Sequence, residues 1–278
     1  MQSYRDFLTR PGRPPAIVVH RGAWTKGPEN SVASMRRAYD AGHPVVEVDV
    51  QQAACGTLFL MHDFTLDRMT GHAEFARRLT MPQLAALRLR DRDGGPDQPF
   101  TEATVPGLAE VLLGAQGRGY LDLDVKFPEL MDDTAACAAA NGAADRVAIK
   151  IPLRNAADAD RLLRLQDRHG VMVMPITNMT ADTVDALCRR VIGVAAAVTE
   201  LSFDTVETLH RAAGLLIPAG VSVWVNTLDV SHSAGLCDTA AQGDPAAVWG
   251  KLFDAGVSVI QTDIPDDLAR FITDRTAA

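Results

Sequence analysis

The sequence predicts a (β/α)8 barrel of the TIM type, and three features of the chain support this fold class. Eight short runs rich in Val, Ile and Leu are nearly continuously apolar, which is typical of parallel strands covered on both faces. Helical patterns lie between these runs, and several of them end at a glycine. The runs begin 28, 76, 27, 24, 23, 27 and 37 residues apart. Eight strands with a repeat of about 27 residues fit the strand–helix unit of such a barrel.

The expected strands and helices alternate along most of the chain. The strands are predicted at Ala16–His20, Pro44–Val50, Tyr120–Lys126, Val147–Pro152, Val171–Ile176, Val194–Glu200, Val221–Asn226 and Ser258–Thr262. The helices are predicted at Ser31–Ala41, Asp132–Asn141, Asn155–His169, Thr180–Arg190, Phe203–Ala213 and Pro245–Ala255. A doubly wound open sheet is the alternative, but it usually has a glycine-rich nucleotide-binding loop after its first strand. The first run here leads into His20–Gly22 instead, which favours the barrel.

One interval is about 50 residues too long for a single strand–helix unit. The excess predicts an insertion after the second strand, over about Gln51–Gly119, within a single domain of residues 1–278. The insertion contains a strand-like run at Leu58–His62 and a helical pattern at Met81–Leu89. Its loop at Arg90–Pro99 is rich in Asp, Gly and Pro, so we expect this loop to be the most mobile stretch.

The composition excludes several classes of protein. With 278 residues, 47% of them hydrophobic and 22% charged, the chain is neither disordered nor collagen-like. The net charge of −8 argues against binding to nucleic acid or to an acidic membrane surface. No run approaches the roughly 18 consecutive apolar residues of a membrane span, and no signal peptide is apparent, so a cytoplasmic protein is expected. The sequence leaves the oligomeric state open.

Polar and charged residues occur near the carboxyl end of most predicted strands. They are His20, Arg21, Glu47, Asp49, Asp122, Asp124, Lys126, Lys150, Glu200, Trp224, Asn226, Gln261 and Asp263. Charged groups in apolar strands are costly unless they are paired or bind a metal. Barrel enzymes build their active sites at this end of the strands, so these residues are the candidates for a functional site.

Three carboxylates suggest a metal site. Glu47 and Asp49 lie two residues apart on one strand and therefore point to the same face, and Asp124 is placed at the end of the next barrel strand. Carboxylate oxygens without sulfur ligands favour a hard divalent cation, Mg²⁺ or Ca²⁺. The alternative is a structural ion network, in which Glu47 and Asp49 pair with Arg21, Lys126 and Lys150.

Two histidines are candidates for proton transfer. His20 and His62 each end an apolar run and precede a charged residue. A single histidine in this position is more often structural, but two of them beside a carboxylate pair favour acid–base catalysis near neutral pH.

Several short motifs together resemble those of the glycerophosphodiester phosphodiesterase family. They are His20–Gly22, Pro28–Asn30, Glu47–Val50, His62–Asp63, Leu66–Arg68, Asp124–Lys126 and Thr262–Pro265, and they extend over almost the whole chain. The resemblance implies a barrel with a small insertion after the second strand. It also implies that His20 and His62 are the catalytic pair and that Glu47, Asp49 and Asp124 bind one divalent cation, although the family usually has Glu in place of Asp124.

The same resemblance suggests how a substrate is bound. Arg21 and Lys126 match residues that hold the phosphate, and we expect Lys150 to be a further phosphate contact and Trp224 a substrate contact. The expected function is hydrolysis of a small phosphodiester, such as a glycerophosphodiester, to a phosphomonoester and an alcohol. Two alternatives stay open, namely a lyase that forms a cyclic phosphate and a non-catalytic phosphate-binding module.

Overall fold

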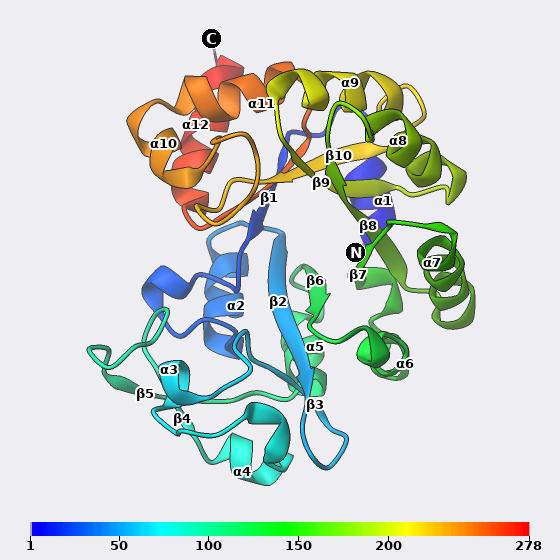
Figure 1. Ribbon diagram of the computed structural model, residues 1–278. Coiled ribbons are helices and arrows are strands. Elements are labelled where there is room, and N and C mark those ends of the chain that lie inside the picture. Colours follow the sequence, from blue (N-terminus) through cyan, green and yellow to red (C-terminus); the bar gives the residue numbers. More distant parts are fainter. Residues whose placement is uncertain (1, 278) are drawn as a thin grey trace. The chain divides into compact units, whose positions relative to one another are not determined.

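The computed structural model describes residues 2–277, and a strand overlaps each of the eight predicted barrel strands (Figure 1). The strands are β1 Ala16–Val19, β2 Val45–Gln52, β3 Leu58–Leu60, β4 Arg88–Arg90, β5 Phe100–Thr104, β6 Tyr120–Val125, β7 Val147–Pro152, β8 Met172–Met179, β9 Val198–Phe203, β10 Ser222–Asn226 and β11 Val259–Thr262. All eight predicted barrel strands are therefore present. Strands β3, β4 and β5 belong to the insertion.

The strand order of the main sheet is β1-β11-β10-β9-β8-β7-β6-β2-β3, and β1 also pairs with β2. The pairs β2–β6, β6–β7, β8–β9, β9–β10 and β10–β11 are parallel, whereas β3 runs antiparallel to β2. With β3 set aside, this order is the cyclic strand order of a (β/α)8 barrel, as the sequence predicts.

The helices are found mainly between consecutive strands. They are α1 Tyr4–Thr9, α2 Val32–Asp40, α3 Asp67–Thr70, α4 Met81–Ala85, α5 Leu108–Ala115, α6 Met131–Ala140, α7 Ala156–His169, α8 Val184–Gly193, α9 Val206–Leu216, α10 Asp238–Gly243, α11 Lys251–Asp254 and α12 Pro265–Ala277. Short 3₁₀ turns occur at Trp24–Lys26, Ala76–Arg78, Pro128–Leu130 and Ala144–Arg146, and a π-helical turn at Ala246–Gly250. No helix of residues 2–277 has the length and apolarity needed to span a bilayer.

The contacts within the chain define two compact units. Unit 1 comprises residues 2–18, 150–168 and 172–277, and unit 2 comprises residues 19–149 and 169–171. Strands β1 and β7 each continue from one unit into the other. The organisation as a single domain stays a prediction from the sequence.

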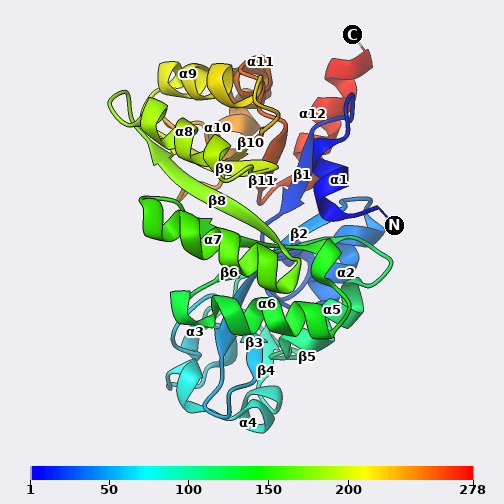
Figure 2. The same cartoon turned by 90° about the vertical axis from the view of Figure 1, so that its right-hand side faces the viewer.

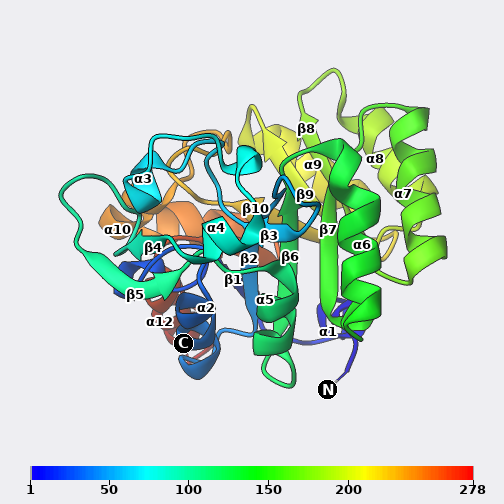
Figure 3. The ribbon, with the colours of Figure 1, turned by 90° about the horizontal axis from the view of Figure 1, so that it is seen from below.

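Unit 2 contains the insertion, which has an apolar core of its own. This core consists of Ala53, Phe59, Met61, Leu66, Met69, Ala76, Leu84, Leu89 and Val105. Helices α2, α5 and α6 pack next to one another in sequence order (Figures 2 and 3). Because the insertion buries its own apolar side chains, it can hold the residues that follow β3 in a fixed position.

The bounds of several predicted elements differ from those observed, and two of these differences have a clear local cause. The insertion helix ends at Ala85 rather than Leu89, because Arg88–Arg90 alternates outward and inward side chains and pairs with β5. Strand β9 begins at Val198 rather than at Val194, since Val194 follows the last residue of α8 and Ala195 turns the chain with a φ of +50°.

Within unit 1, helices α8 and α9 pack side by side (Figure 2). The parallel strands β8 to β11 contribute mainly buried side chains. Polar side chains at Lys150, Glu200, Asn226 and Gln261 interrupt this apolar pattern, at positions that the sequence singles out.

Candidate active site

A tight turn after β1 positions the first two predicted site residues, His20 and Arg21. Arg21 and Gly22 have φ angles of +54° and +80°. A Cβ atom at Gly22 would lie 2.6 Å from Ser34 Oγ, so the turn fits against α2 only with glycine at this position. The turn allows the backbone N–H of Arg21 to donate to Glu47 Oε2 at 3.2 Å, and His20 Nε2 lies 4.0 Å from the same oxygen.

The three predicted metal ligands lie together on β2 and β6. Asp49 and Asp124 are register partners across the two parallel strands, and Glu47 lies two residues before Asp49 on the same face. One ligand oxygen from each of the three carboxylates lies within 4.8 Å of the others. Asp122, the register partner of Glu47, is fully buried and is not a member of this set.

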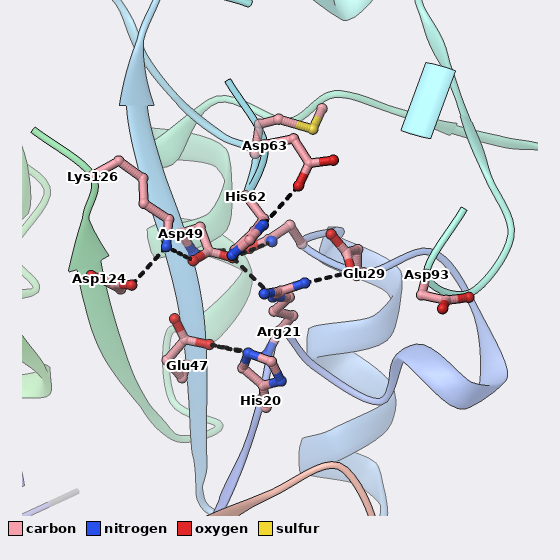
Figure 4. Close-up of polar contacts among 12 residues, drawn as sticks. His20, Arg21, Glu29, Glu47, Asp49, His62, Asp63, Asp93, Asp124 and Lys126 are labelled. Carbon is pink, nitrogen blue, oxygen red and sulfur yellow. Dashed lines mark hydrogen bonds and ion pairs between the residues drawn. The ribbon is translucent and has the colours of Figure 1, made fainter. Parts of the chain in front are cut away.

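Cationic side chains partly neutralise these carboxylates. Lys126 Nζ lies 2.6 Å from Asp49 Oδ1 and 2.8 Å from Asp124 Oδ2, and Arg21 Nε lies 3.3 Å from Asp49 Oδ2 (Figure 4). Burial opposes ionisation of Asp49, but the charges of Lys126, Arg21 and His62 outweigh it and hold the pKa of Asp49 below its usual value. Burial also opposes the charge on Lys126, yet the neighbouring carboxylates hold the pKa of its ammonium above the usual value.

The insertion carries His62 into this group. Gln51 donates from Nε2 to the backbone oxygens of Met61 and Asp63, both at 2.8 Å, and thereby fixes the segment on either side of His62. The ring nitrogen Nδ1 of His62 lies 2.7 Å from Asp63 Oδ1. The ring lies next to Asp49 in Figure 4. The predicted delivery of His62 to the carboxylate pair therefore agrees with the arrangement in unit 2.

Three further residues of unit 2 hold the site together, although the sequence analysis assigned them no role. Asn30 donates from Nδ2 to Asp49 Oδ2 at 2.7 Å and accepts the backbone N–H of Asp49 at 2.9 Å. Glu29 and Arg68 bind each other at 2.6 Å. All three occur in the short motifs that carry the family resemblance, and this is the signal that could have identified them.

Lys150 and Trp224 belong to unit 1 and form a cluster there. Lys150 Nζ lies 2.8 Å from Glu200 Oε2, 3.0 Å from Gln261 Oε1 and 5.2 Å from the centre of the Trp224 ring. Trp224 donates from Nε1 to Asn226 Oδ1 at 2.7 Å, and Asn226 Nδ2 donates to Glu200 Oε1 at 3.0 Å. Within unit 1, Lys150 is thus ion-paired with Glu200 and hydrogen-bonded to Gln261.

Carboxylates outnumber guanidinium and ammonium groups among the unit 2 residues that the contacts above join. The residues joined by the contacts above provide five carboxylates, Glu29, Glu47, Asp49, Asp63 and Asp124, against three permanent cations, Arg21, Arg68 and Lys126. Buried carboxylates that lie close together repel one another and are costly unless positive charge lies near them. The charge and the all-oxygen donor set of Glu47, Asp49 and Asp124 both fit a hard divalent cation.

Fold and site together define a class of protein. A barrel with two histidines, a cluster of carboxylates and adjacent Arg and Lys side chains has groups that suit a phosphodiesterase. The chain belongs to the glycerophosphoryl diester phosphodiesterase family, because the model of that family matches residues 20–266. The resemblance inferred from the short motifs is therefore confirmed.

Two curated relatives match part of the chain. A glycerophosphodiester phosphodiesterase from Caldanaerobacter subterraneus subsp. tengcongensis is 33% identical over 95 residues, which are 34% of this chain and 38% of the relative. The glycerophosphoinositol inositolphosphodiesterase GDPD2 of Homo sapiens is 36% identical over 144 residues, 44% of this chain and 25% of the relative. The matched region spans less than half the length of these relatives.

Solved structures match the chain over nearly its whole length. A glycerophosphoryl diester phosphodiesterase from Parabacteroides distasonis has a TM-score of 0.78 at 22% identity and covers 99% of this chain and 93% of its own. A phosphodiesterase from Oleispira antarctica, solved in complex with the product sn-glycerol-3-phosphate, has a TM-score of 0.68 at 19% identity and covers 94% and 97%. At these identities the similarity supports the barrel fold.

Proposed function

We propose that this protein hydrolyses a small phosphodiester, most favourably a glycerophosphodiester, to a phosphomonoester and an alcohol. The observation that carries the proposal is the grouping of both histidines with Arg21 and Lys126 around one cluster of carboxylates in unit 2. Membership of the family and the product bound to the Oleispira antarctica structure support the choice of substrate class.

The reaction replaces the ester bond between phosphorus and the alcohol oxygen by a bond to water. One of His20 and His62 takes a proton from the attacking water, and the other gives a proton to the departing alcohol oxygen. Arg21 and Lys126 donate hydrogen bonds to the phosphoryl oxygens, on which negative charge accumulates. A divalent cation held by Glu47, Asp49 and Asp124 would supply further charge stabilisation at the phosphoryl group.

Asp63 orients the ring of His62, and the backbone N–H of Arg21 orients the carboxylate of Glu47. Because Nδ1 of His62 faces the Asp63 carboxylate at 2.7 Å, Nε2 is the nitrogen left to exchange a proton with the substrate or water. Glu47 Oε2 accepts the N–H of Arg21, which fixes a carboxylate oxygen 4.0 Å from His20 Nε2.

The predicted roles of Lys150 and Trp224 belong to the same proposal. Lys150 is 5% exposed and Trp224 is fully buried. Lys150 forms an ion pair with Glu200, and Trp224 donates to Asn226, which in turn donates to Glu200. We propose that Lys150 and Trp224 contribute to substrate binding by holding the Glu200 and Asn226 side chains in place.

Phosphorus NMR of reaction products is the experiment that tests this function. The purified chain is stripped with a chelator and offered a panel of glycerophosphodiesters and simple alkyl diesters, with and without added Mg²⁺ or Ca²⁺. A phosphomonoester signal that depends on the added cation supports the proposal, and a cyclic phosphate signal identifies the lyase alternative instead. Binding of diesters without any product over the whole panel would indicate a non-catalytic phosphate-binding module and would overturn the proposal.

A variant pair guards against a contaminating activity in this experiment. The double variant His20→Ala with His62→Ala removes both proton-transfer groups and is expected to lose the signal. His72→Ala changes an exposed histidine of the insertion and is expected to retain it. Equal activity in both variants would show that the product does not come from this site.

A further inference from the structure

We propose that Arg68 is a positioning residue for both His62 and Arg21. It acts through two carboxylates, Asp63 and Glu29, one on each side of its guanidinium group. This inference rests on the proposed function for its effect on turnover, whereas its structural part can be tested without any activity.

The first branch leads from Arg68 to His62. Arg68 donates from Nε to Asp63 Oδ2 at 2.6 Å and from Nη2 to Asp63 Oδ1 at 3.0 Å, so the guanidinium holds the carboxylate in a bidentate pair. The same Oδ1 atom lies 2.7 Å from His62 Nδ1. A carboxylate fixed in this way holds the imidazole ring in one orientation and favours the tautomer with its proton on Nδ1.

The second branch leads from Arg68 to Arg21. Arg68 Nη2 also donates to Glu29 Oε1 at 2.6 Å, and Arg21 Nη1 donates to the other oxygen, Glu29 Oε2, at 3.0 Å. Glu29 is 2% exposed, so the carboxylate that both guanidinium groups share is almost completely removed from water. Because Arg68 neutralises part of the Glu29 charge, Glu29 neutralises less of the positive charge on Arg21. Arg21 can therefore attract a phosphate more strongly.

Arg68 also connects the site to the loop between β4 and β5. The Arg68 guanidinium donates to the backbone oxygen of Asp93, and the N–H of Gly95 donates to the backbone oxygen of Arg68 at 2.8 Å. A Cβ atom at Gly94 would lie 2.6 Å from that same backbone oxygen, so only glycine allows this close approach. The backbone N–H of Glu29 donates to Arg92 at 2.9 Å. The stretch expected to be mobile is therefore anchored where it meets Arg68 and Glu29.

The arrangement exceeds what a purely structural salt bridge requires. A structural pair would be satisfied by either carboxylate alone, whereas Arg68 contacts two carboxylates that each bind a different predicted site residue. A lysine could supply the charge but not the planar fork that reaches Asp63 twice and Glu29 once. Arg68→Lys is therefore the variant that separates geometry from charge.

Nitrogen NMR of the imidazole rings in the metal-free protein tests the first branch without any turnover. The signals of His62 are identified by their absence in His62→Ala, and they are recorded in the parent, in Arg68→Ala and in Arg68→Lys. We expect Nδ1 to carry the proton in the parent, and Arg68→Ala to gain a population with the proton on Nε2. The control is Arg88→Ala, which removes an exposed ion pair with Glu102 in the same insertion. Unchanged His62 signals in Arg68→Ala would overturn the proposal.

Kinetics test the consequence for the proposed reaction. We expect Arg68→Ala to lower kcat about 10- to 100-fold with a smaller change in KM, because it disturbs the orientation of groups that remain present. The double variant of Arg68→Ala and Asp63→Asn should lower kcat by much less than the two single losses combined, since both substitutions release the His62 ring. Additive losses would show that Arg68 acts independently of Asp63 and would contradict the positioning role. If no diester is turned over at all, the NMR experiment still decides the role of Arg68, and only the proposed function fails.

Discussion

The ammonium nitrogen of Lys126 lies 2.6 Å from Asp49 Oδ1, so a side-chain cation already neutralises one of the three carboxylates that could hold a metal ion. A divalent cation bound by these carboxylates would therefore compete with Lys126 for Asp49 and would leave the ammonium group available to a phosphate. This relationship makes the effect of a substitution at Lys126 differ in sign between ion binding and turnover.

We predict that Lys126→Met binds Mg²⁺ or Ca²⁺ about tenfold or more tightly than the parent, because the carboxylates lose a competing positive charge. The same variant should turn over phosphodiesters more slowly, since the phosphate loses a donor. Titration calorimetry in the absence of substrate measures the affinity. Lys251→Met, at an exposed lysine of α11, should change neither quantity. Weaker ion binding by Lys126→Met would show that Lys126 supports the cation instead of opposing it.

The carboxylate at position 124 offers a second test of the metal site. Asp124→Glu restores the residue that is usual in the family and should retain activity, because the side chain still ends in a carboxylate. Asp124→Asn removes one negative charge and should weaken binding of the divalent cation at least tenfold. Calorimetry and turnover after exhaustive chelation check both variants. Full turnover in the chelated parent protein would exclude a role for the cation in catalysis.

The histidine pair predicts a difference between substrates. His20→Ala and His62→Ala should each lower turnover of an alkyl diester about 10²- to 10⁴-fold. A diester with p-nitrophenolate as leaving group needs little protonation, so it should restore activity to the variant that lacks the acid and not to the one that lacks the base. Absorbance of released p-nitrophenolate provides the measurement, with His72→Ala as the unaffected control. Near-normal turnover of the alkyl diester by both variants would rule out the acid–base roles.

Much of the fold could be predicted because its determinants are local. The apolar runs of β1, β2 and β6 bury both faces, and the polar residues at their ends interrupt a regular pattern. The insertion was less predictable, since Arg88–Arg90 is a strand only because it pairs with Phe100–Thr104. Pairing between separate segments cannot be inferred from the helical pattern of one of them.

The short motifs contain the supporting residues of the site, but the contacts of these residues could not be predicted for the same reason. Asn30 and Asp49 are 19 residues apart in sequence, and Arg68 and Glu29 are 39 apart, so these contacts exist only in the folded chain. Lys150 and Gln261 are likewise 111 residues apart in sequence, so their hydrogen bond exists only in the folded chain.

A glycine substitution tests whether the turn after β1 positions the site. Gly22→Ala should destabilise the protein by about 1–3 kcal/mol, because the new methyl group meets Ser34 and φ is positive. It should also lower turnover, since the N–H of Arg21 loses its alignment with Glu47. Gly56→Ala is the matched control, with a φ of +85° and nothing within 4 Å of the added atom. Urea unfolding measures stability, and kinetics measure turnover. Equal effects of the two variants would show that the close approach of Gly22 to Ser34 does not position the site.

A buried carboxyl group in unit 1 predicts how stability depends on pH. Asp238, at the start of α10, accepts hydrogen bonds from Thr227 Oγ1 at 2.6 Å, Thr262 Oγ1 at 2.8 Å and the N–H of Asp263 at 2.8 Å. These bonds tie the loop after β10 to the end of β11. Burial raises the pKa of Asp238 to about 6, although the hydrogen bonds favour the ionised form.

The folded protein therefore retains this proton over a range of pH in which the unfolded chain, with a carboxyl pKa of about 4, has lost it. The folded state binds more protons between about pH 4 and about pH 6, so the Asp238 contribution to the free energy of unfolding falls as the pH rises through this window. The total decrease is on the order of 3 kcal/mol for a shift of about two units. Carboxylates with lowered pKa values, such as Asp49 and Asp63, act in the opposite direction, so the parent alone cannot isolate the effect.

The comparison with Asp238→Asn isolates the contribution of Asp238, because the amide does not titrate. Urea unfolding at several pH values should show the parent losing stability relative to Asp238→Asn from about pH 4 to about pH 7. If the stability of the parent relative to Asp238→Asn stays constant or increases as the pH rises, Asp238 is ionised in the folded protein throughout this range.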